Sequence, residues 1–350
     1  MKHQHYNVIG IMSGTSLDGV DIVHAKLVSQ PEWGFQIHAT QCISYTQAWR
    51  ARLAHAVSMD LEEIEQLDRD YTRLLAGIIN DFKSRNPTSN ILAICAHGHT
   101  VKHEPVKGIT IQIGNRPELA TLTRERVVCD FRIQDVQLGG QGAPLVPIGD
   151  HLLFASYDYC LNLGGFSNVS LLKNNSRIAY DICPVNVVLN TLATRLGKEY
   201  DEGGAFAKAG TINTPVVNQL NRLDYYTAPA PKSLGMEWVN HEVMPLIKQL
   251  DPVDAIATFT DHAARQISKA LPANERVLAT GGGVYNSYLM DRIAHYRGAV
   301  ISLPSDSLIN YKEALIFGLL GVLRLRNQNN CLATVTGASH DHSSGKIYLP

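Results

Sequence analysis

The chain has 350 residues, which is enough for about two domains with sizeable hydrophobic cores. Its composition, 45% hydrophobic and 18% charged, is that of an ordinary globular protein, and 31 basic residues nearly balance 32 acidic ones. The lack of a basic block argues against nucleic acid as the main ligand, and no apolar run approaches the ~20 residues needed to cross a bilayer.

The first predicted element is a β-hairpin over residues 7–27, in which two apolar runs flank a short segment of Ser, Gly, Thr and Asp. The glycines in this segment permit close backbone approach and positive φ angles, and the hydroxyl side chains add hydrogen-bond donors. Such a turn can direct several N–H groups at one anion, while Asp18 and Asp21 can hold a cation beside it. The segment therefore predicts a phosphate-binding turn.

Downstream of the hairpin, apolar strand-like runs alternate with helical stretches, which is typical of an α/β protein. The expected strands are Ile91–Cys95, Ile109–Ile113, Val127–Asp130, Cys160–Leu163, Val169–Leu172 and Val277–Thr280. The expected helices are Leu61–Asn86, Val187–Leu196, Asp261–Leu271, Asn286–His295 and Lys312–Asn327.

Two further glycine turns follow. The stretch 159–172 is again strand, glycine turn and strand, which either marks a second copy of the first hairpin in a two-halved protein or is a chance recurrence of a common motif. The stretch 277–286 passes through three glycines into a helix, and it fits either a ligand-facing backbone or a tight strand-to-helix turn. The Gly- and Pro-rich stretch 137–149 is the natural connection between domains. The P-loop, Rossmann and nucleophile-elbow motifs are absent.

The histidine and cysteine patterns carry less information. His97 and His99 would share one face of a strand, as metal-binding H-x-H pairs do, but no matching partner set follows, so we leave any metal ligands unassigned and expect His97 to form hydrogen bonds. We expect His340 and His342 to lie on the solvated surface. The six cysteines are scattered without a C-x-x-C pair, and the N-terminal segment lacks signal-peptide features, which together predict a cytoplasmic protein.

Longer motifs are distributed over the whole chain. They are Ile11-Met-Ser-Gly-Thr-Ser-Leu-Asp-Gly-Val-Asp21, His97-Gly98, Thr110-Ile-Gln-Ile-Gly114, Val127-Val-Cys-Asp-Phe-Arg132, Gly139-Gly-Gln-Gly-Ala-Pro-Leu-Val-Pro147, Asn162-Leu-Gly-Gly-Phe-Ser-Asn168, Pro231-Lys-Ser-Leu-Gly235, Thr280-Gly-Gly-Gly283 and Lys312-Glu-Ala-Leu-Ile-Phe317. On these motifs the sequence resembles the anhydro-N-acetylmuramic acid kinase family from end to end.

The resemblance implies an α/β fold of the actin/hexokinase type, with two ribonuclease-H-like domains around a central cleft. We expect an N-terminal lobe over residues 1–138 and a C-terminal lobe over 139–350, with the last helical residues packing back on the first lobe. The implied reaction opens the 1,6-anhydro ring of anhydro-N-acetylmuramic acid with water and phosphorylates O6 from ATP with Mg²⁺. The implied setting is peptidoglycan recycling by a cytoplasmic homodimer.

The resemblance also implies residue roles. Asp181 is the catalytic base, although its position before Pro184 would equally suit a helix cap. Substrate binding is assigned to His97, Arg132 and Glu313. Without the resemblance, Arg132 would pair with Asp130 or Asp135, and Glu313 would be a first-turn carboxylate that offsets the helix dipole. Nucleotide binding is assigned to Gly14, Thr15, Ser16, Leu17, Asp18, Gly19, Val20, Asp21, Gly164, Gly165, Gly281, Gly282, Gly283 and Asn286. Asp18 could instead stabilise its turn.

Some positions depart from the common family pattern. Cys183 stands where many relatives have glycine, so the conformation after Asp181 is an open question, and Asn190, His99 and Met236 also differ. Three alternatives remain beside this reading: a kinase of another sugar, because the fold hosts many substrates; a non-catalytic nucleotide-dependent switch, as actin-like folds can be; and a metal hydrolase built on the histidines.

Overall fold

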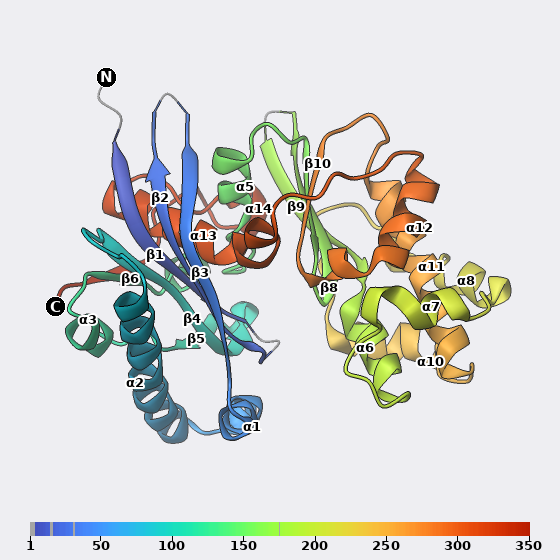
Figure 1. The fold of residues 1–350 in the computed structure, drawn as a ribbon, viewed down its shortest axis with the longest axis horizontal. Coiled ribbons are helices and arrows are strands. Elements are labelled where there is room, and N and C mark those ends of the chain that lie inside the picture. The colour runs from blue at the N-terminus through green and yellow to red at the C-terminus, as the bar shows by residue number, and fades with distance from the viewer. Residues whose placement is uncertain (1–3, 15–16, 31, 175) are drawn as a thin grey trace. The chain divides into compact units, whose positions relative to one another are not determined.

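The computed structural model describes residues 4–14, 17–30, 32–174 and 176–350 (Figure 1). The chain divides into two compact units, Met1–Leu153 together with Tyr311–Pro350, and Phe154–Asn310. In the part of the chain that is described, no helix is long and apolar enough to span a membrane.

The division at Leu153 differs from the expected boundary at residue 138. Helix α5 (Pro147–Leu153) belongs to the first unit because it packs on the returning C-terminal segment. Gly149 lies so close to Ile316 that an added Cβ would come within 2.5 Å of its side chain, and Asp150 forms a buried ion pair of 2.7 Å with Lys312. The connection therefore continues past the glycine-rich stretch.

The first unit contains a mixed sheet in the order β11-β6-β4-β1-β2-β3, with β5 added on β4. Strands β1, β2 and β3 form an antiparallel meander, β4 is parallel to β1, and β6 is parallel to β4. The strands are β1 (His5–Ser13), β2 (Gly19–Val28), β3 (Gly34–Ser44), β4 (Ala93–Glu104), β5 (Ile109–Ile113), β6 (Val127–Cys129) and β11 (Lys346–Tyr348). The central parts of β1 and β4 are buried, as expected for a sheet covered on both faces.

The helices of this unit include two long ones that pack on the sheet (Figure 1). Helix α2 (Leu61–Arg85) begins at a capping box on Asp60 and buries one apolar face against the sheet. Helix α13 (Asp306–Leu325) lies directly on β1, because an added Cβ on Gly10 would be 1.9 Å from the Ala314 carbonyl oxygen. The others are α1 (Gln47–His55), α3 (Glu118–Thr123), α4 (Ile133–Gln137), α5 and α14 (Ala333–Thr336), with 3₁₀ turns at Ala56–Ser58 and Pro105–Lys107.

The second unit contains a four-stranded sheet in the order β10-β7-β8-β9. Its strands are β7 (Tyr159–Leu163), β8 (Phe166–Lys173), β9 (Ser176–Pro184) and β10 (Val277–Thr280). Its helices are α6 (Asn186–Thr194), α7 (Ala205–Ala209), α8 (Thr214–Leu220), α9 (Met236–Trp238), α10 (Met244–Ile247), α11 (Pro252–Ala270) and α12 (Ser287–Arg297), with a π turn at Val239–Val243 and 3₁₀ turns at Glu202–Gly204, Asp224–Tyr226 and Gly282–Tyr285. The central helix α11 is buried along most of its length, within a core shared with the sheet and α6.

Both units repeat one strand arrangement: three consecutive antiparallel strands, then a later strand parallel to the first of them. The predicted α/β class with duplicated ribonuclease-H-like units is thereby confirmed. Two expected helices start too late. Helix α11 begins at Pro252 after the cap Asp251, and α13 begins at Asp306 rather than near Lys312.

Candidate functional site

The first glycine turn connects β1 to β2 in an antiparallel hairpin, in which Met12 pairs with Asp21. Thr15 and Ser16 lie outside the described residues. On the far side of the turn, Leu17 adopts a positive φ of 59°. Gly19 has no room for a side chain, because an added Cβ would be 2.3 Å from the Ile43 carbonyl oxygen. The turn is therefore held close to β3, with Gly14 at the end of β1.

Two carboxylates follow this turn. Asp18 is exposed, and its carbonyl oxygen accepts a hydrogen bond from the Tyr45 amide at 3.3 Å. Asp21 is half-buried, and burial raises the pKa of its carboxyl group. A hydrogen bond with the Cys42 thiol lowers this pKa in part, and the negative charge of Asp18 adds a smaller rise. The two oxygen donors suit a hard cation, whose charge would relieve the desolvation of Asp21. Val20, between them, is buried in the core and offers only its backbone.

His97 and Arg132 form a directly bonded pair. The Arg132 Nε donates to His97 Nε2 at 2.9 Å, and its Nη1 donates to the Gly142 carbonyl oxygen at 2.6 Å. Burial and the neighbouring guanidinium hold the pKa of His97 well below its ordinary value, so its ring is neutral and its Nε2 is an acceptor. Burial lowers the pKa of Arg132 to about 10, and this arginine therefore stays charged at neutral pH. The pair presents a fixed cation, as recognition of a carboxylate requires.

Glu313 lies in the same unit on helix α13, two turns after the helix begins. The expectation that it stands in the first helical turn is therefore wrong, and the helix dipole does not explain a carboxylate there. Its pKa is raised by burial, against the opposing charges of Lys312 and Arg132. Phe317, one turn later, packs its ring 4.8 Å from the ring of His97. The structure thus brings this face of α13 to the His97–Arg132 pair.

The expectation that His97 and His99 share one strand face is wrong. Gly98 between them has a φ of 80°, which interrupts the alternation of β4. The His97 ring lies beside Phe317 of α13, whereas the His99 ring lies 6.0 Å from that of Tyr71 on α2. The two imidazoles therefore do not converge on a metal.

The second and third glycine turns lie together in the second unit. Strand β10 runs parallel to β7, so that Thr280 pairs with Asn162 and both strands end at the same edge. An added Cβ on Gly281, which has a φ of 87°, would be 2.5 Å from Asn162 Oδ1, and one on Gly283 would be 2.8 Å from Leu163. Gly164 and Gly165 follow directly, and the Gly165 carbonyl oxygen accepts from the amide of Val185, before α6.

Around these glycines, Gly282 is exposed, whereas Asn286 has a structural role as the cap of α12. Its Oδ1 accepts from the Leu289 amide at 2.9 Å. The side chain also packs on Gly204, where an added Cβ would be 2.3 Å from Asn286 Oδ1. No sequence pattern marks Gly204 for this contact.

Asp181 lies within β9, opposite Asn168, and Val185 rather than Asp181 occupies the cap of α6. The helix-cap alternative for Asp181 is therefore wrong. Its Oδ2 accepts from the Leu234 amide at 2.9 Å, and among the described residues its Oδ1 makes no hydrogen bond. Burial raises the pKa of this half-buried carboxyl group, and the Leu234 N–H partly offsets the rise. A carboxylate held at one oxygen is suited to accept a proton at the other.

The surroundings of Asp181 were only partly anticipated. The Asp181 amide donates to the Lys232 carbonyl oxygen at 3.1 Å, and the Tyr225 hydroxyl donates to the Asp181 carbonyl oxygen at 2.6 Å. The motif at 231–235 is recognisable in the sequence, whereas the role of Tyr225 is not, because nothing in its local sequence signals a contact with a distant strand. Cys183 continues β9 opposite Ser167 without a positive φ, so the departure from glycine does not end the strand, but the pairing register shifts by one residue between Asp181 and Cys183.

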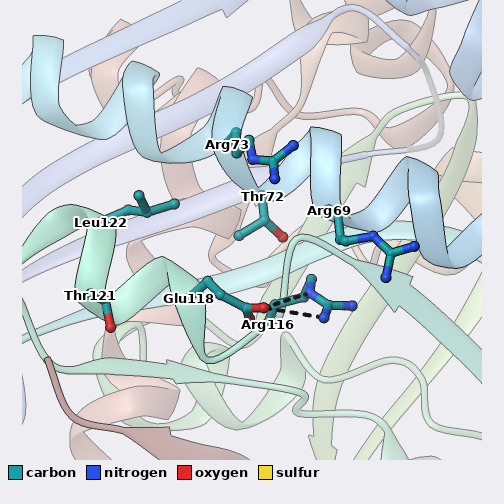
Figure 2. Close-up of a pocket in the computed structure, with 7 residues that line it drawn as sticks. All are labelled: Arg69, Thr72, Arg73, Arg116, Glu118, Thr121 and Leu122. Atoms are coloured by element: carbon teal, nitrogen blue, oxygen red, sulfur yellow. Dashed lines mark hydrogen bonds and ion pairs between the residues drawn. The ribbon is translucent and has the colours of Figure 1, made fainter.

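A separate pocket of about 310 Å³ lies between α2 and α3 in the first unit (Figure 2). Three arginines line it, but each pairs with a carboxylate: Arg69 with Glu65, Arg73 with Asp70, and Arg116 with Glu118. Because their charges are already compensated, and because none of the predicted site residues that the structure describes lines the pocket, we do not include it in the candidate site.

Comparison with known proteins identifies the relatives of this chain. Residues 6–350 match the family model described as anhydro-N-acetylmuramic acid kinase. The chain is 34% identical to a protein of that name from Saccharophagus degradans, over 98% of each chain, and 34% identical to one from Pseudomonas syringae pv. syringae, over 97% of this chain and 98% of the other. Among solved structures, it is similar to xylulose kinase from Lactobacillus acidophilus, with a TM-score of 0.46 and 10% identity, over 99% of this chain and 94% of the other.

Proposed function

The chain belongs to the anhydro-N-acetylmuramic acid kinase family, and from this premise we propose how its residues divide the work of the reaction. The protein is an ATP-dependent kinase of anhydro-N-acetylmuramic acid. Water opens the 1,6-anhydro ring, and the freed O6 takes the γ-phosphoryl group, which gives N-acetylmuramic acid 6-phosphate and ADP.

Asp181 is the general base, and its environment is the observation that carries this assignment. Its Oδ2 is fixed by the Leu234 amide, while Oδ1 remains for a water molecule. The pKa raised by burial makes the carboxylate a stronger base than an exposed aspartate. Asp181 takes the proton from the water that attacks the anomeric carbon, and the bond from that carbon to O6 breaks as the new C–O bond forms.

The nucleotide phosphates are bound by the first hairpin turn, through the backbone of Gly14 to Asp21. The support is the tight approach of Gly19 to β3 and the exposed position of Asp18. Asp18 and Asp21 supply oxygen ligands near which Mg²⁺ would be held, and the ion would neutralise phosphate charge during transfer. The paired turns at Gly164–Gly165 and Gly281–Gly283 receive the adenosine part, and the support is that the two turns lie together, with Gly282 exposed.

The sugar is recognised by His97, Arg132 and Glu313. The Arg132 guanidinium is committed through Nε and Nη1, which leaves Nη2 to bind the lactyl carboxylate of the muramic sugar. The half-buried Glu313, with its raised pKa, is suited to hydrogen-bond a polar group of the sugar. We infer further that the enzyme works as a cytoplasmic homodimer in peptidoglycan recycling. Sedimentation analysis tests the dimer, which a monomer at all concentrations would contradict.

Mass spectrometry of the product tests the reaction. The protein is incubated with ATP, Mg²⁺ and the anhydro sugar in ¹⁸O-labelled water. We expect a phosphorylated sugar that carries one ¹⁸O atom at the anomeric hydroxyl and none in the phosphate. Phosphorylation of an ordinary hexose, without turnover of the anhydro sugar, would instead indicate a kinase of another sugar.

A further inference from the structure

Three side chains that could bind a metal ion lie close together in the interior of the first unit. Asp135 comes from α4, and Cys331 and His342 come from the C-terminal segment. Their exposed fractions are 0%, 1% and 4%. One ligand atom from each lies within 4.8 Å of the other two. The expectation that His342 is a surface residue is therefore wrong, because the polar segment around it folds back into the unit.

The backbone places Cys331 and His342 side by side. They form an antiparallel bridge, in which the Cys331 amide donates to the His342 carbonyl oxygen at 3.1 Å and the His342 amide donates to the Cys331 carbonyl oxygen at 3.3 Å. Directly opposed residues of such a bridge send their side chains to the same face, with neighbouring Cβ atoms. The buried amide of Asn330 bonds the carbonyl oxygens of Leu320 and Ser344, which anchors the bridge.

Asp135 is fixed before any ion binds. Its Oδ2 accepts from the Gly142 amide at 2.7 Å, and its Oδ1 accepts from the Thr336 hydroxyl at 2.7 Å. Gly140 lies against the carboxylate, so close that an added Cβ would be 2.2 Å from Oδ2. Each carboxylate oxygen has a second lone pair, so these bonds orient the group without exhausting its capacity to bind a cation.

His342 supplies the observation that points to a ligand. Its Nδ1 is 3.1 Å from the His340 carbonyl oxygen, to which only an N–H can donate. Its Nε2 is buried, makes no hydrogen bond to any described residue, and lies 3.5 Å from Asp135 Oδ1. Leaving a buried nitrogen without a partner costs free energy. In a metal-bound histidine, one ring nitrogen usually donates its hydrogen to a carbonyl group and the other faces the metal. The His342 ring has this arrangement, since its Nδ1–H is held by a carbonyl group and its Nε2 lies near the potential ligand atoms of Asp135 and Cys331.

We propose that Asp135, Cys331 and His342 form a binding site for a single Zn²⁺ ion. A thiolate, an imidazole and a carboxylate are ligands that zinc accepts together, and a water molecule would complete four-coordination. Ligand bonds of about 2.0–2.3 Å place tetrahedral donors roughly 3.5 Å apart. The His342 Nε2 and Asp135 Oδ1 atoms are already 3.5 Å apart, and the Cys331 sulfur lies within 4.8 Å of a ligand atom of each residue. On binding, the sulfur–hydrogen bond is replaced by a sulfur–zinc bond, and the proton leaves to solvent.

The ion would tie the C-terminal segment to the loop that holds Arg132. The Gly142 amide donates to Asp135, and the Gly142 carbonyl oxygen accepts from Arg132. A single residue thus joins the metal ligand to the arginine. The site is a structural clamp, and it requires none of the substrate assignments above.

Metal content and cobalt spectroscopy test the site. The full chain is made without a histidine tag, stripped with a chelator and loaded with Zn²⁺ or Co²⁺. We expect one ion per chain and a thiolate-to-cobalt charge-transfer band. Cys331→Ser and His342→Gln should each weaken zinc binding by at least ~100-fold, since even outer partners of a metal ligand contribute 10–100-fold. His340→Gln is the matched control, because it changes the neighbouring exposed ring and keeps the backbone carbonyl group.

The competing interpretation is an ion pair between protonated His342 and Asp135 beside an inert thiol. It predicts no stoichiometric zinc and no charge-transfer band in the unmodified chain. That result, or zinc binding that Cys331→Ser leaves unchanged, would overturn the proposal. The cobalt spectrum of the unmodified chain decides the matter even if a variant fails to fold.

Discussion

Replacing Asp181 with asparagine removes the proposed base while keeping its anchoring bond. Asparagine Oδ1 can still accept from the Leu234 amide, as Asp181 Oδ2 does at 2.9 Å, and the backbone bonds to Lys232 and Tyr225 are unaffected. We therefore expect the variant to fold with undiminished stability, since burial disfavours the charged form of Asp181. It lacks only the oxygen that would take the proton from water.

The expected loss follows from the contribution of general bases, which is about 10²–10⁴-fold in rate, or roughly 2.7–5.4 kcal/mol of barrier. We expect kcat/KM to fall by this factor, with binding of ATP unchanged. In the unmodified enzyme, activity should decrease as the pH falls through the pKa of Asp181, which burial places above its ordinary value of 3.8. This acid limb should be absent from the variant.

The assay is steady-state formation of ADP and sugar phosphate between pH 4 and 8, with Asp291→Asn on the exposed side of α12 as the matched control. The control should retain the activity and the acid limb. An Asp181→Asn variant with nearly full activity, or with the same acid limb, would refute the assignment of the base.

Three further perturbations test other parts of the chain. Arg132→Lys should raise KM for the anhydro sugar about 10–100-fold, because one charge-assisted hydrogen bond is worth ~1.5–3 kcal/mol; unchanged sugar kinetics would contradict its role. Gly281→Ala should lower the free energy of unfolding by about 2–4 kcal/mol, because the added Cβ would meet Asn162 and the residue has a positive φ. The control Gly298→Ala, which has a positive φ but open space around it, should lower it by only ~1 kcal/mol, and equal losses in denaturant titrations would refute the steric argument. Burial lowers the pKa of His99 to about 4, so between pH 6.5 and 4 the unfolded chain binds a proton that the folded chain does not. The free energy of unfolding should therefore fall by up to ~1.4 kcal/mol per pH unit over this range, and a slope that His99→Gln leaves unchanged would contradict the prediction.

The local sequence determined which segments form strands, helices and glycine turns. Period-two apolar runs and glycine clusters are properties of neighbouring residues, so β5 and β10 have the predicted bounds, and β1 pairs with β2 and β7 with β8 as the two predicted hairpins require. The start of α13 was placed six residues too late, because the polar residues Asp306, Ser307 and Asn310 interrupt the apolar pattern although Leu308 and Ile309 are buried.

Only the tertiary structure decided which distant groups meet. Gly98 turns His97 and His99 to different helices, and a single backbone angle of this kind has no periodic signal in the sequence. Likewise, Tyr225 reaches Asp181 and His342 reaches Asp135 across long stretches of chain. Such contacts depend on how buried surfaces pack against one another, which is why a polar tail could supply a buried imidazole.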